Sequence, residues 1–178
     1  GDAWAMAVRD GKRAFLVVDG LGHGLSAHEA AQAGTVAFAE QPFDEPIRLM
    51  NSLHAAMTGT RGGAAAVAQY DTAAGSLRYA GIGNISGSLV TLEDSRGLAS
   101  HPGIVGVQAR RAQAFDFPGV QGKLMVMYSD GLISRWNIRD YPGLASRHPA
   151  VVTALLHRDF NRGRDDVTIL AAHLGADP

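Results

Sequence analysis

The segment AFLVVDGLGHG, residues 14–24, constrains the fold more than any other part of the chain. Five apolar residues lead directly into Asp19, and glycines at 20, 22 and 24 surround His23 before a helical pattern begins at Ser26. A short continuous apolar run is typical of a buried strand, and glycine allows a tight turn. The sequence therefore predicts a rigid buried strand that presents an aspartate at its end, next to a strand-to-helix turn.

The length and composition suit one domain. A chain of 178 residues that is 46% apolar can bury a sizeable core, so we expect residues 1–178 to form a single domain. The sequence begins at Gly1 and enters a strand-like pattern at once, and we expect that it was cut from a longer chain or lacks its first residues.

Charge and residue usage exclude several classes of function. The net charge of −1 favours neither nucleic acid nor an anionic membrane as a partner. The chain has no cysteine, which excludes disulfides, cysteine-based zinc sites and cysteine nucleophiles. No apolar run reaches the roughly 18 residues of a membrane span, and no signal peptide is visible. We expect a cytoplasmic protein.

The first third of the chain predicts a hairpin followed by two helices. Residues 3–9 and 13–19 are strand-like and are joined by Asp10-Gly11-Lys12, a hairpin signal. A helix is expected from an N-cap at Ser26 to about residue 41, with small side chains that allow close packing. A second is expected from an N-cap at Asp44, with Pro46 in its first turn and Gly59 at its end.

The rest of the chain is rich in strand patterns. A helix is expected at 149–160, an irregular loop at 93–106 and a hairpin across Pro118-Gly119. The predicted strands are residues 64–70, 76–82, 86–92, 111–117, 123–129 and 167–173. This order predicts the α+β class, with helices outside a sheet or a pair of sheets.

The glycine loop alone leaves several interpretations open. Its simplest interpretation is a tight turn. Dinucleotide binding requires G-x-G-x-x-G, but the third glycine comes one place early and Leu25 occupies its position. Asp19 would also repel a pyrophosphate, and no Gly-Lys-Ser/Thr follows as in a phosphate-binding Walker loop. A nucleotide site is therefore disfavoured, and a turn or a metal-binding carboxylate remains.

Three further aspartates favour the metal site. Asp2, Asp130 and Asp165 each stand next to glycine or another aspartate at the edge of a strand-like run. Each alone is more often part of a turn. Together at one place, four carboxylates would raise one another's pKa unless a cation were present. Oxygen donors without a histidine–cysteine set favour Mg²⁺ or Mn²⁺ over Zn²⁺, so the pattern indicates a metal-dependent hydrolase.

The ordered set of motifs resembles the metal-dependent protein phosphatases of the 2C type, and among them the bacterial SpoIIE/RsbX-like branch. The matching segments are GDAWA, VVDGLGHG, YAGIGN, MYSDGL and GRDDVTIL, and they span essentially the whole chain. The resemblance implies a four-layer α-β-β-α sandwich with two mainly antiparallel sheets and a metal cleft at one edge. It also implies hydrolysis of phosphoserine or phosphothreonine by a water that bridges two Mn²⁺ or Mg²⁺ ions.

The same resemblance implies a role for each matching residue. Asp19 would bridge both ions, and the Gly20 carbonyl would contact one of them. Asp130 and Asp165 would complete the shell of the other ion. Asp2 would hold metal-bound water. Asp166 stands where asparagine is common and would have a supporting or structural role at the metals.

Three positions depart from the pattern of eukaryotic relatives. His23 could protonate the leaving group. The loop before it is two residues longer than the loop of the eukaryotic relatives, and the alternative is a loop histidine bonded to the backbone. Asn84 stands where relatives with a third metal carry aspartate, so such an ion should bind weakly. The arginine that grips phosphate would precede Gly1; Arg61 and Arg135 are the candidates to replace it, and a solvated or structural role is the alternative.

The resemblance also implies partners, and rival functions remain. The implied substrate is a phosphorylated STAS-domain protein, either an anti-sigma antagonist or a stressosome component, and the opposing kinase is of the anti-sigma type. One rival is a pseudo-phosphatase that binds a phosphoprotein or kinase without turnover. The others are a hydrolase of small phosphate esters and a nucleotide-binding oxidoreductase.

Overall fold

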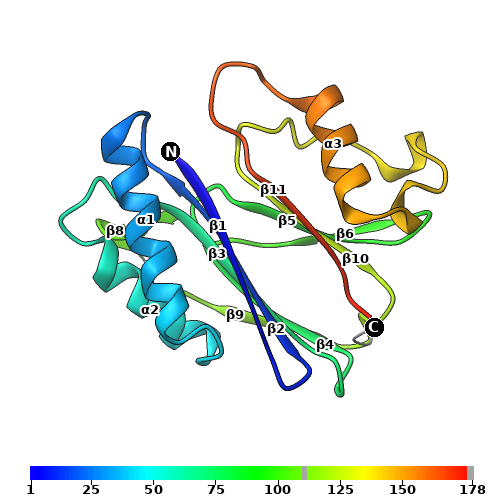
Figure 1. Ribbon diagram of the computed structural model, residues 1–178, viewed down its shortest axis with the longest axis horizontal. Helices are drawn as coiled ribbons and strands as arrows, with labels where there is room; N and C mark the ends of the chain where they lie inside the picture. The colour runs from blue at the N-terminus through cyan, green and yellow to red at the C-terminus, as the bar shows by residue number, and fades with distance from the viewer. Residues whose placement is uncertain (110–111, 176–178) are drawn as a thin grey trace.

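Two antiparallel sheets form the centre of the computed structural model, which describes residues 1–109 and 112–175 (Figure 1). The first sheet has the strand order β1-β2-β3-β4-β9 and the second has the order β11-β10-β5-β6. The first contains β1 (Asp2–Arg9), β2 (Lys12–Gly20), β3 (Gly63–Asp71), β4 (Ser76–Ile82) and β9 (Ala114–Phe117). The second contains β5 (Ser86–Val90), β6 (Ser95–Leu98), β10 (Leu124–Tyr128) and β11 (Ile169–His173).

Helices cover the outer faces of both sheets. The helices are α1 (Leu25–Glu40), α2 (Pro46–Met57) and α3 (Pro149–Phe160), and the 3-10 turns are η1 (Ile138–Asp140) and η2 (Leu144–Ser146). Figure 1 shows α1 and α2 on one side of the paired sheets and α3 on the other. This is the predicted four-layer α+β sandwich. No helix in the described ranges is long and apolar enough to cross a membrane.

The alternation of side chains along β2 sets the direction in which Asp19 points. Leu16 and Val18 pack with the helices α1 and α2, whereas Phe15 and Val17 pack in the core between the two sheets. The apolar run is continuous because β2 is buried on both faces. Since successive side chains alternate, Asp19 falls on the face of Phe15 and Val17 and points between the sheets.

Small residues allow α1 to approach the sheet closely, as expected from its composition. A Cβ atom added to Gly34 would lie 3.2 Å from Cγ2 of Val18, and Gly20 at the end of β2 is closer still to the helix. A Cβ on Gly20 would lie 2.0 Å from the carbonyl oxygen of Ala27. The helix begins at Leu25 with Gly24 in the cap position and no side-chain cap, so the predicted N-cap at Ser26 is wrong.

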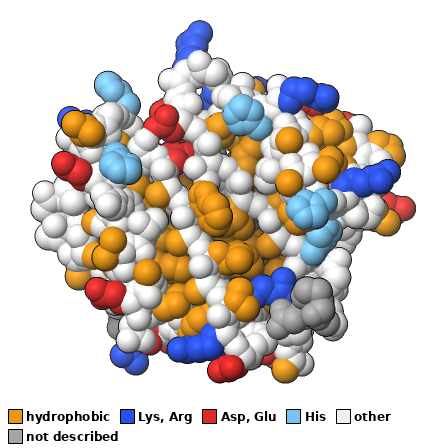
Figure 2. Space-filling view, viewed as in Figure 1, with side chains coloured by type: hydrophobic (Ala, Val, Ile, Leu, Met, Phe, Trp, Pro, Cys, Tyr) orange, Lys and Arg blue, Asp and Glu red, His pale blue; other side chains and the backbone are white. Residues whose placement is uncertain are grey.

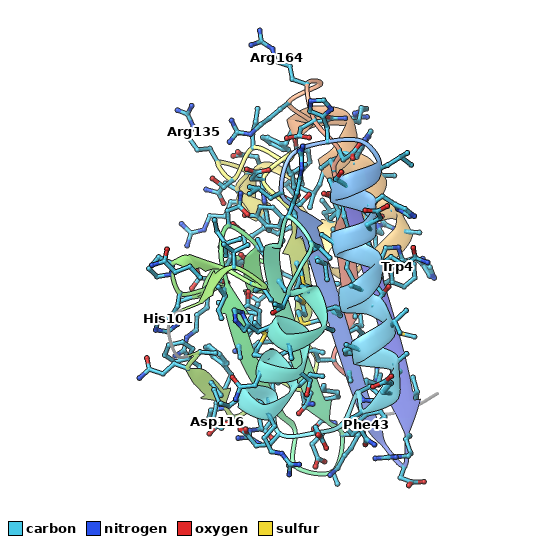
Figure 3. The ribbon with its side chains drawn as sticks, turned by 90° about the vertical axis from the view of Figure 1, so that its left-hand side faces the viewer. Trp4, Phe43, His101, Asp116, Arg135 and Arg164 are labelled. Carbon is cyan, nitrogen blue, oxygen red and sulfur yellow. The ribbon has the colours of Figure 1, made fainter. Side chains whose placement is uncertain are left out.

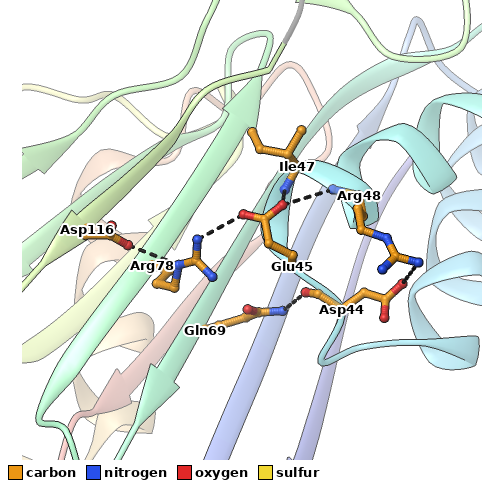
Figure 4. A network of polar contacts seen from close by, with 7 residues as sticks. All are labelled: Asp44, Glu45, Ile47, Arg48, Gln69, Arg78 and Asp116. Atoms are coloured by element: carbon orange, nitrogen blue, oxygen red, sulfur yellow. Dashed lines mark hydrogen bonds and ion pairs between the residues drawn. The ribbon is translucent and has the colours of Figure 1, made fainter.

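The N-cap of α2 is Glu45 and not the predicted Asp44. Oε2 of Glu45 accepts hydrogen bonds from the backbone N–H groups of Ile47 and Arg48, at 2.9 and 3.4 Å (Figure 4). Its other oxygen accepts a 2.9 Å hydrogen bond from Arg78, which also binds Asp116 on β9. Arg78 on β4 thus holds the Glu45 side chain at the start of α2. The two residues are far apart in sequence, so spacing alone does not predict this contact.

The predicted hairpin across Pro118-Gly119 is wrong. β9 pairs with β4 in the first sheet, whereas β10 lies between β5 and β11 in the second sheet. Residues 118–123 therefore carry the chain from one sheet to the other, with Val120 N donating to the Gly75 carbonyl. A turn signal fixes a change of direction but does not specify the sheet that each flank joins. Residues 110 and 111 lie outside the described part of the predicted strand.

Short strands occupy part of the segment that we expected to be an irregular loop. β6 continues the second sheet within residues 93–106. β7 (Gly103–Ile104) pairs with β8 (Gln108–Ala109) as a separate two-stranded ribbon. β6 is exposed along most of its length, so its polar sequence carries no burial pattern from which a strand could be predicted.

The inter-sheet core opens to solvent along β1. Figure 2 shows apolar side chains gathered in the middle of the face on which β1 and β11 are seen side by side in Figure 1. Trp4 and Met6 on β1 are 61% and 54% exposed, and they line a groove shared with β11 and α3. Asp2 belongs to the same face of β1, at the end of this groove.

Candidate metal centre

Two of the predicted aspartates face each other across β1 and β2. The antiparallel register pairs Asp2 with Asp19, so both side chains lie on the inter-sheet face. Asp19 is in turn paired with Ala64 on β3, whose small side chain leaves room beside the carboxylate. Like charges placed directly opposite each other destabilise a sheet, so this pair is a feature that packing alone would not favour.

Asp130 comes from the other sheet, directly after β10. Met127 and Met125 face the inter-sheet core, so Ser129 continues on that face and Asp130 begins the following turn. Gly131 then packs against the backbone of residue 166: a Cβ at this position would lie 2.1 Å from the carbonyl oxygen of Asp166. Only glycine permits this approach, which brings the S-D-G and D-D segments together.

Asp165 and Asp166 lie on the segment that leads into β11. The backbone N–H of Asp166 donates to Oδ1 of Asp165 at 2.9 Å, which fixes the Asp165 carboxylate against its own turn. The Asp166 carboxylate contacts the amino group of Gly1. Asp165 is among the causes of the raised Asp19 pKa, and Asp166 is not.

Three other aspartates influence the pKa of Asp19. Burial, the charges of Asp2, Asp130 and Asp165, and a hydrogen bond to Asp2 together raise the pKa of Asp19 from 3.8 to about 7, and burial is the largest cause. These carboxylates come from four chain segments and from both sheets. Asp2, Asp130 and Asp165 each disfavour ionisation of the half-buried Asp19. Among residues 1–109 and 112–175, no arginine or lysine contributes an opposing effect at Asp19.

The donor set fits a hard divalent cation. Carboxylate oxygens are the preferred ligands of Mg²⁺ and Mn²⁺, and a cation would offset both the burial and the repulsion that raise the Asp19 pKa. Within residues 1–109 and 112–175, however, no three His, Cys, Asp or Glu side chains lie together as a ready-made metal-binding group. The assignment of Asp19, Gly20, Asp130 and Asp165 as metal ligands therefore stays a prediction.

His23 lies in the loop between Asp19 and α1. Its side chain is exposed, and it forms no hydrogen bond with any described residue, so the backbone-bonded alternative is not what the structure contains. Gly22 and Gly24 on either side have φ angles of 90° and 77°, which glycine adopts without strain. The loop thus leaves the imidazole free to meet a ligand from solvent.

Asn84 interacts directly with one of the aspartates. Its Nδ2 donates a 2.6 Å hydrogen bond to Oδ2 of Asp130, across the connection between β4 and β5. An amide at this position supplies a donor to the carboxylate, whereas an aspartate would add a fifth negative charge.

Arg61 lies against the glycine loop. A Cβ added to Gly22 would lie 2.8 Å from Nη1 of Arg61, and the Leu21 N–H donates to the carbonyl of Gly62 at 2.8 Å. The Arg61 side chain is exposed and has no hydrogen-bond or ion-pair partner among the described residues. Arg135, the other candidate, projects into solvent from the surface in Figure 3.

Sequence reasoning missed Ser129 as part of this cluster. Ser129 Oγ donates a 2.5 Å hydrogen bond to Oδ2 of Asp2 and accepts one from the Thr168 N–H at 3.0 Å. Ser129 could have been predicted from its position directly before Asp130, at the end of an apolar strand. Because side chains alternate along a strand, Ser129 points toward the other sheet.

The raised pKa predicts how stability depends on pH in EDTA. Because the pKa of Asp19 is higher in the folded chain than its ordinary value of 3.8, the folded state binds more protons between about pH 4 and pH 7. The contribution of Asp19 to the free energy of unfolding should therefore fall as the pH rises through this window and level off above it. Urea unfolding of the wild type and of Asp19→Asn across the window measures it, and equal slopes for the two proteins would contradict the assignment.

Comparisons with known proteins identify the family and the fold. The family model for stage II sporulation protein E (SpoIIE) matches residues 9–175, whereas no curated protein matches the chain. A protein solved in work on the bacterial stressosome, a modular system adapted to control secondary messenger signalling, superposes with a TM-score of 0.87 at 23% identity over 97% of this chain and 90% of its own. RsbX in complex with magnesium gives 0.82 at 20% identity, covering 96% and 85%.

A more distant likeness extends to a named phosphatase. The serine/threonine phosphatase PstP/Ppp of Mycobacterium tuberculosis superposes with a TM-score of 0.69 at 16% identity, over 98% of each chain. These superpositions establish the shared fold. The family model covers residues 9–175, which is nearly the whole sequence. The chain therefore belongs to the SpoIIE family, a family of PP2C-type serine/threonine protein phosphatases.

Proposed function

We propose that residues 1–178 form a metal-dependent phosphatase domain that hydrolyses phosphoserine or phosphothreonine on a bacterial signalling protein. The observation that carries this proposal is the β1–β2 register, which sets Asp2 directly opposite Asp19 on the inter-sheet face; the pKa of Asp19, raised by burial and by Asp2, Asp130 and Asp165, supports it. A fold that gathers four carboxylates at one edge of its two sheets needs a cation to make them compatible. Membership of the SpoIIE family supports phosphate ester hydrolysis as the reaction.

The residues assigned to the metals come from both sheets. Asp19, the Gly20 carbonyl, Asp130 and Asp165 are the groups that would hold two Mn²⁺ or Mg²⁺ ions. Asp2 and Asp166 support these ligands from outside. When bound, such ions neutralise phosphoryl charge and lower the pKa of water, so that water attacks phosphorus without a covalent phospho-enzyme.

The chain's own residues account for the movement of protons. Asp19 must be ionised to act as a ligand, and because its pKa is about 7, loading of the site near neutral pH releases a proton. Water attacks phosphorus while the bond from phosphorus to the serine or threonine oxygen breaks, and that oxygen must gain a proton. We assign this donation to His23, whose exposed imidazole stands in the loop directly after Asp19.

Arg61 is the arginine that we assign to the substrate phosphate. It has no partner among the described residues, and it lies against Gly22 in the loop between Asp19 and His23. Its own loop is held rigidly: Thr60 Oγ1 donates to the Met57 carbonyl at 2.7 Å and accepts from the Gly62 N–H at 3.0 Å. A guanidinium on a fixed loop loses little entropy when it binds phosphate.

The proposed partners follow from the relatives. A likeness to a protein of the stressosome system favours a phosphorylated STAS-domain protein as the substrate, opposed by a kinase of the anti-sigma type. We therefore propose that the chain acts in partner switching during stress signalling, in the cytoplasm. The alternative within the same pathways is a pseudo-phosphatase that binds the phosphoprotein or kinase without turnover.

The direct test of this function is hydrolysis of p-nitrophenyl phosphate with added Mn²⁺ and with EDTA. We expect metal-dependent turnover that falls by about 100-fold or more in Asp130→Asn, because the amide cannot replace a charged ligand. Asp116→Asn is the matched control: the same chemical change on β9, in a side chain that is 73% exposed and paired with Arg78. It should retain wild-type turnover.

The other outcomes separate the alternatives. Mn²⁺ binding measured by calorimetry without turnover, on either p-nitrophenyl phosphate or a phosphopeptide, would favour the pseudo-phosphatase. Turnover of small phosphate esters but not of phosphopeptides would favour a hydrolase of metabolites. Absence of Mn²⁺ binding would overturn the metal centre itself.

Substitution of Arg61 tests the phosphate contact. We expect Arg61→Ala to lower kcat/KM for a phosphopeptide by about 10- to 100-fold, because charge-assisted hydrogen bonds contribute about 1.5–3 kcal/mol, with Arg61→Lys recovering part of the loss. Arg135→Ala is the control and should change kcat/KM by less than about twofold. Steady-state kinetics in saturating Mn²⁺ measure both, and an Arg61→Ala enzyme indistinguishable from the control would show that this arginine does not bind substrate.

A further inference from the structure

Ser129 differs from every other polar side chain that the structure describes. In residues 1–109 and 112–175 it is the one buried side chain of the polar and charged classes, tyrosines apart, with no exposed surface. Buried hydroxyls are retained where their hydrogen bonds are satisfied, and both of the Ser129 hydrogen bonds go to the edge of the proposed metal centre.

The directions of these hydrogen bonds are fixed by chemistry. The Thr168 N–H can only donate, so Oγ of Ser129 accepts from it at 3.0 Å. The Ser129 hydroxyl proton is then directed at Oδ2 of Asp2, at 2.5 Å. The Ser129 N–H also donates to the Thr168 carbonyl at 3.1 Å, so two hydrogen bonds join these residues beyond the ends of β10 and β11. The orientation of the hydroxyl is therefore set by the second sheet.

Asp2, the acceptor, belongs to the first sheet. It lies opposite Asp19 in the β1–β2 register, and its charge is one of the causes of the raised Asp19 pKa. Without an anchor, the two carboxylates would favour rotamers that separate them. A short hydrogen bond from a buried donor holds Asp2 in place against that repulsion, at a fixed distance from the segment that carries Asp130.

We propose that Ser129 is a positioning residue of the metal centre, which holds Asp2 of the first sheet in register with Asp130 of the second before a cation arrives. The inference rests on the metal-binding function proposed above. Ser129 contacts neither substrate nor cation in this account and acts through Asp2.

Mn²⁺ titration calorimetry on the full 178-residue chain tests the proposal. Ser129→Ala should weaken Mn²⁺ binding by about tenfold, the usual effect of removing a residue that orients a ligand. Ser129→Cys, which keeps the size of the side chain but is a weak donor, should also weaken binding, and it serves if the alanine variant does not fold. Ser100→Ala is the matched control, because Ser100 Oγ bonds the Ile85 carbonyl and Tyr79 away from the aspartates; its Mn²⁺ affinity should equal that of the wild type.

A double-mutant cycle separates positioning from a general loss of stability. In the Asp2→Ala background, Ser129→Ala should change Mn²⁺ affinity by less than about twofold, because the residue through which it acts is gone. The same tenfold loss in both backgrounds would overturn the proposal, and so would a Ser129→Cys protein that binds Mn²⁺ like the wild type. Failure of the wild type to bind Mn²⁺ would overturn the metal centre and this inference together, whereas wild-type binding with unaffected variants would overturn only the inference.

Discussion

Repulsion between carboxylates is the constraint on which the rest of this structure depends. The β1–β2 register sets Asp2 directly opposite Asp19, and the ends of the second sheet add the charges of Asp130 and Asp165. Such a group opposes folding increasingly as the pH rises from about 4 to 7, because burial and these charges raise the pKa of Asp19 and make its ionisation less favourable in the folded chain than in the unfolded chain. A fold that keeps this group has to stabilise it with rigid strands and close backbone packing. In our account, the function of these four carboxylates is to bind a divalent cation, which neutralises their charge.

The glycines of the motifs serve this packing. Gly20 lets α1 approach the end of β2, and Gly131 lets the turn after Asp130 lie on the backbone of residue 166. A side chain at either position would meet a carbonyl oxygen at about 2 Å. Asp19 and Asp130 are therefore each followed by a glycine that allows a neighbouring segment to approach closely. Ser129 adds a buried hydrogen bond between the two sheets at the same edge.

The residue pattern was sufficient to predict the α+β class and aspartates at the ends of strands, for a physical reason, whereas the four-layer arrangement was implied only by the family resemblance. The run from Ala14 to Val18 is buried on both faces and reads as a central strand, and aspartates at strand ends mark an edge. The N-cap at Glu45 and the sheet change at residues 118–123 were missed, because they depend on Arg78 and on the pairing of β10, both distant in sequence. Ser129 was missed because its role exists only where two sheets meet.

The central claim is that the four aspartates form one cation centre. Anomalous diffraction from crystals grown with Mn²⁺ tests it most directly, because the metal is located without reference to activity. The account predicts two anomalous peaks that share the Asp19 carboxylate, with Asp130 and Asp165 at one of them. Absence of a peak at this edge of the two sheets, or peaks only at other surfaces, would contradict it.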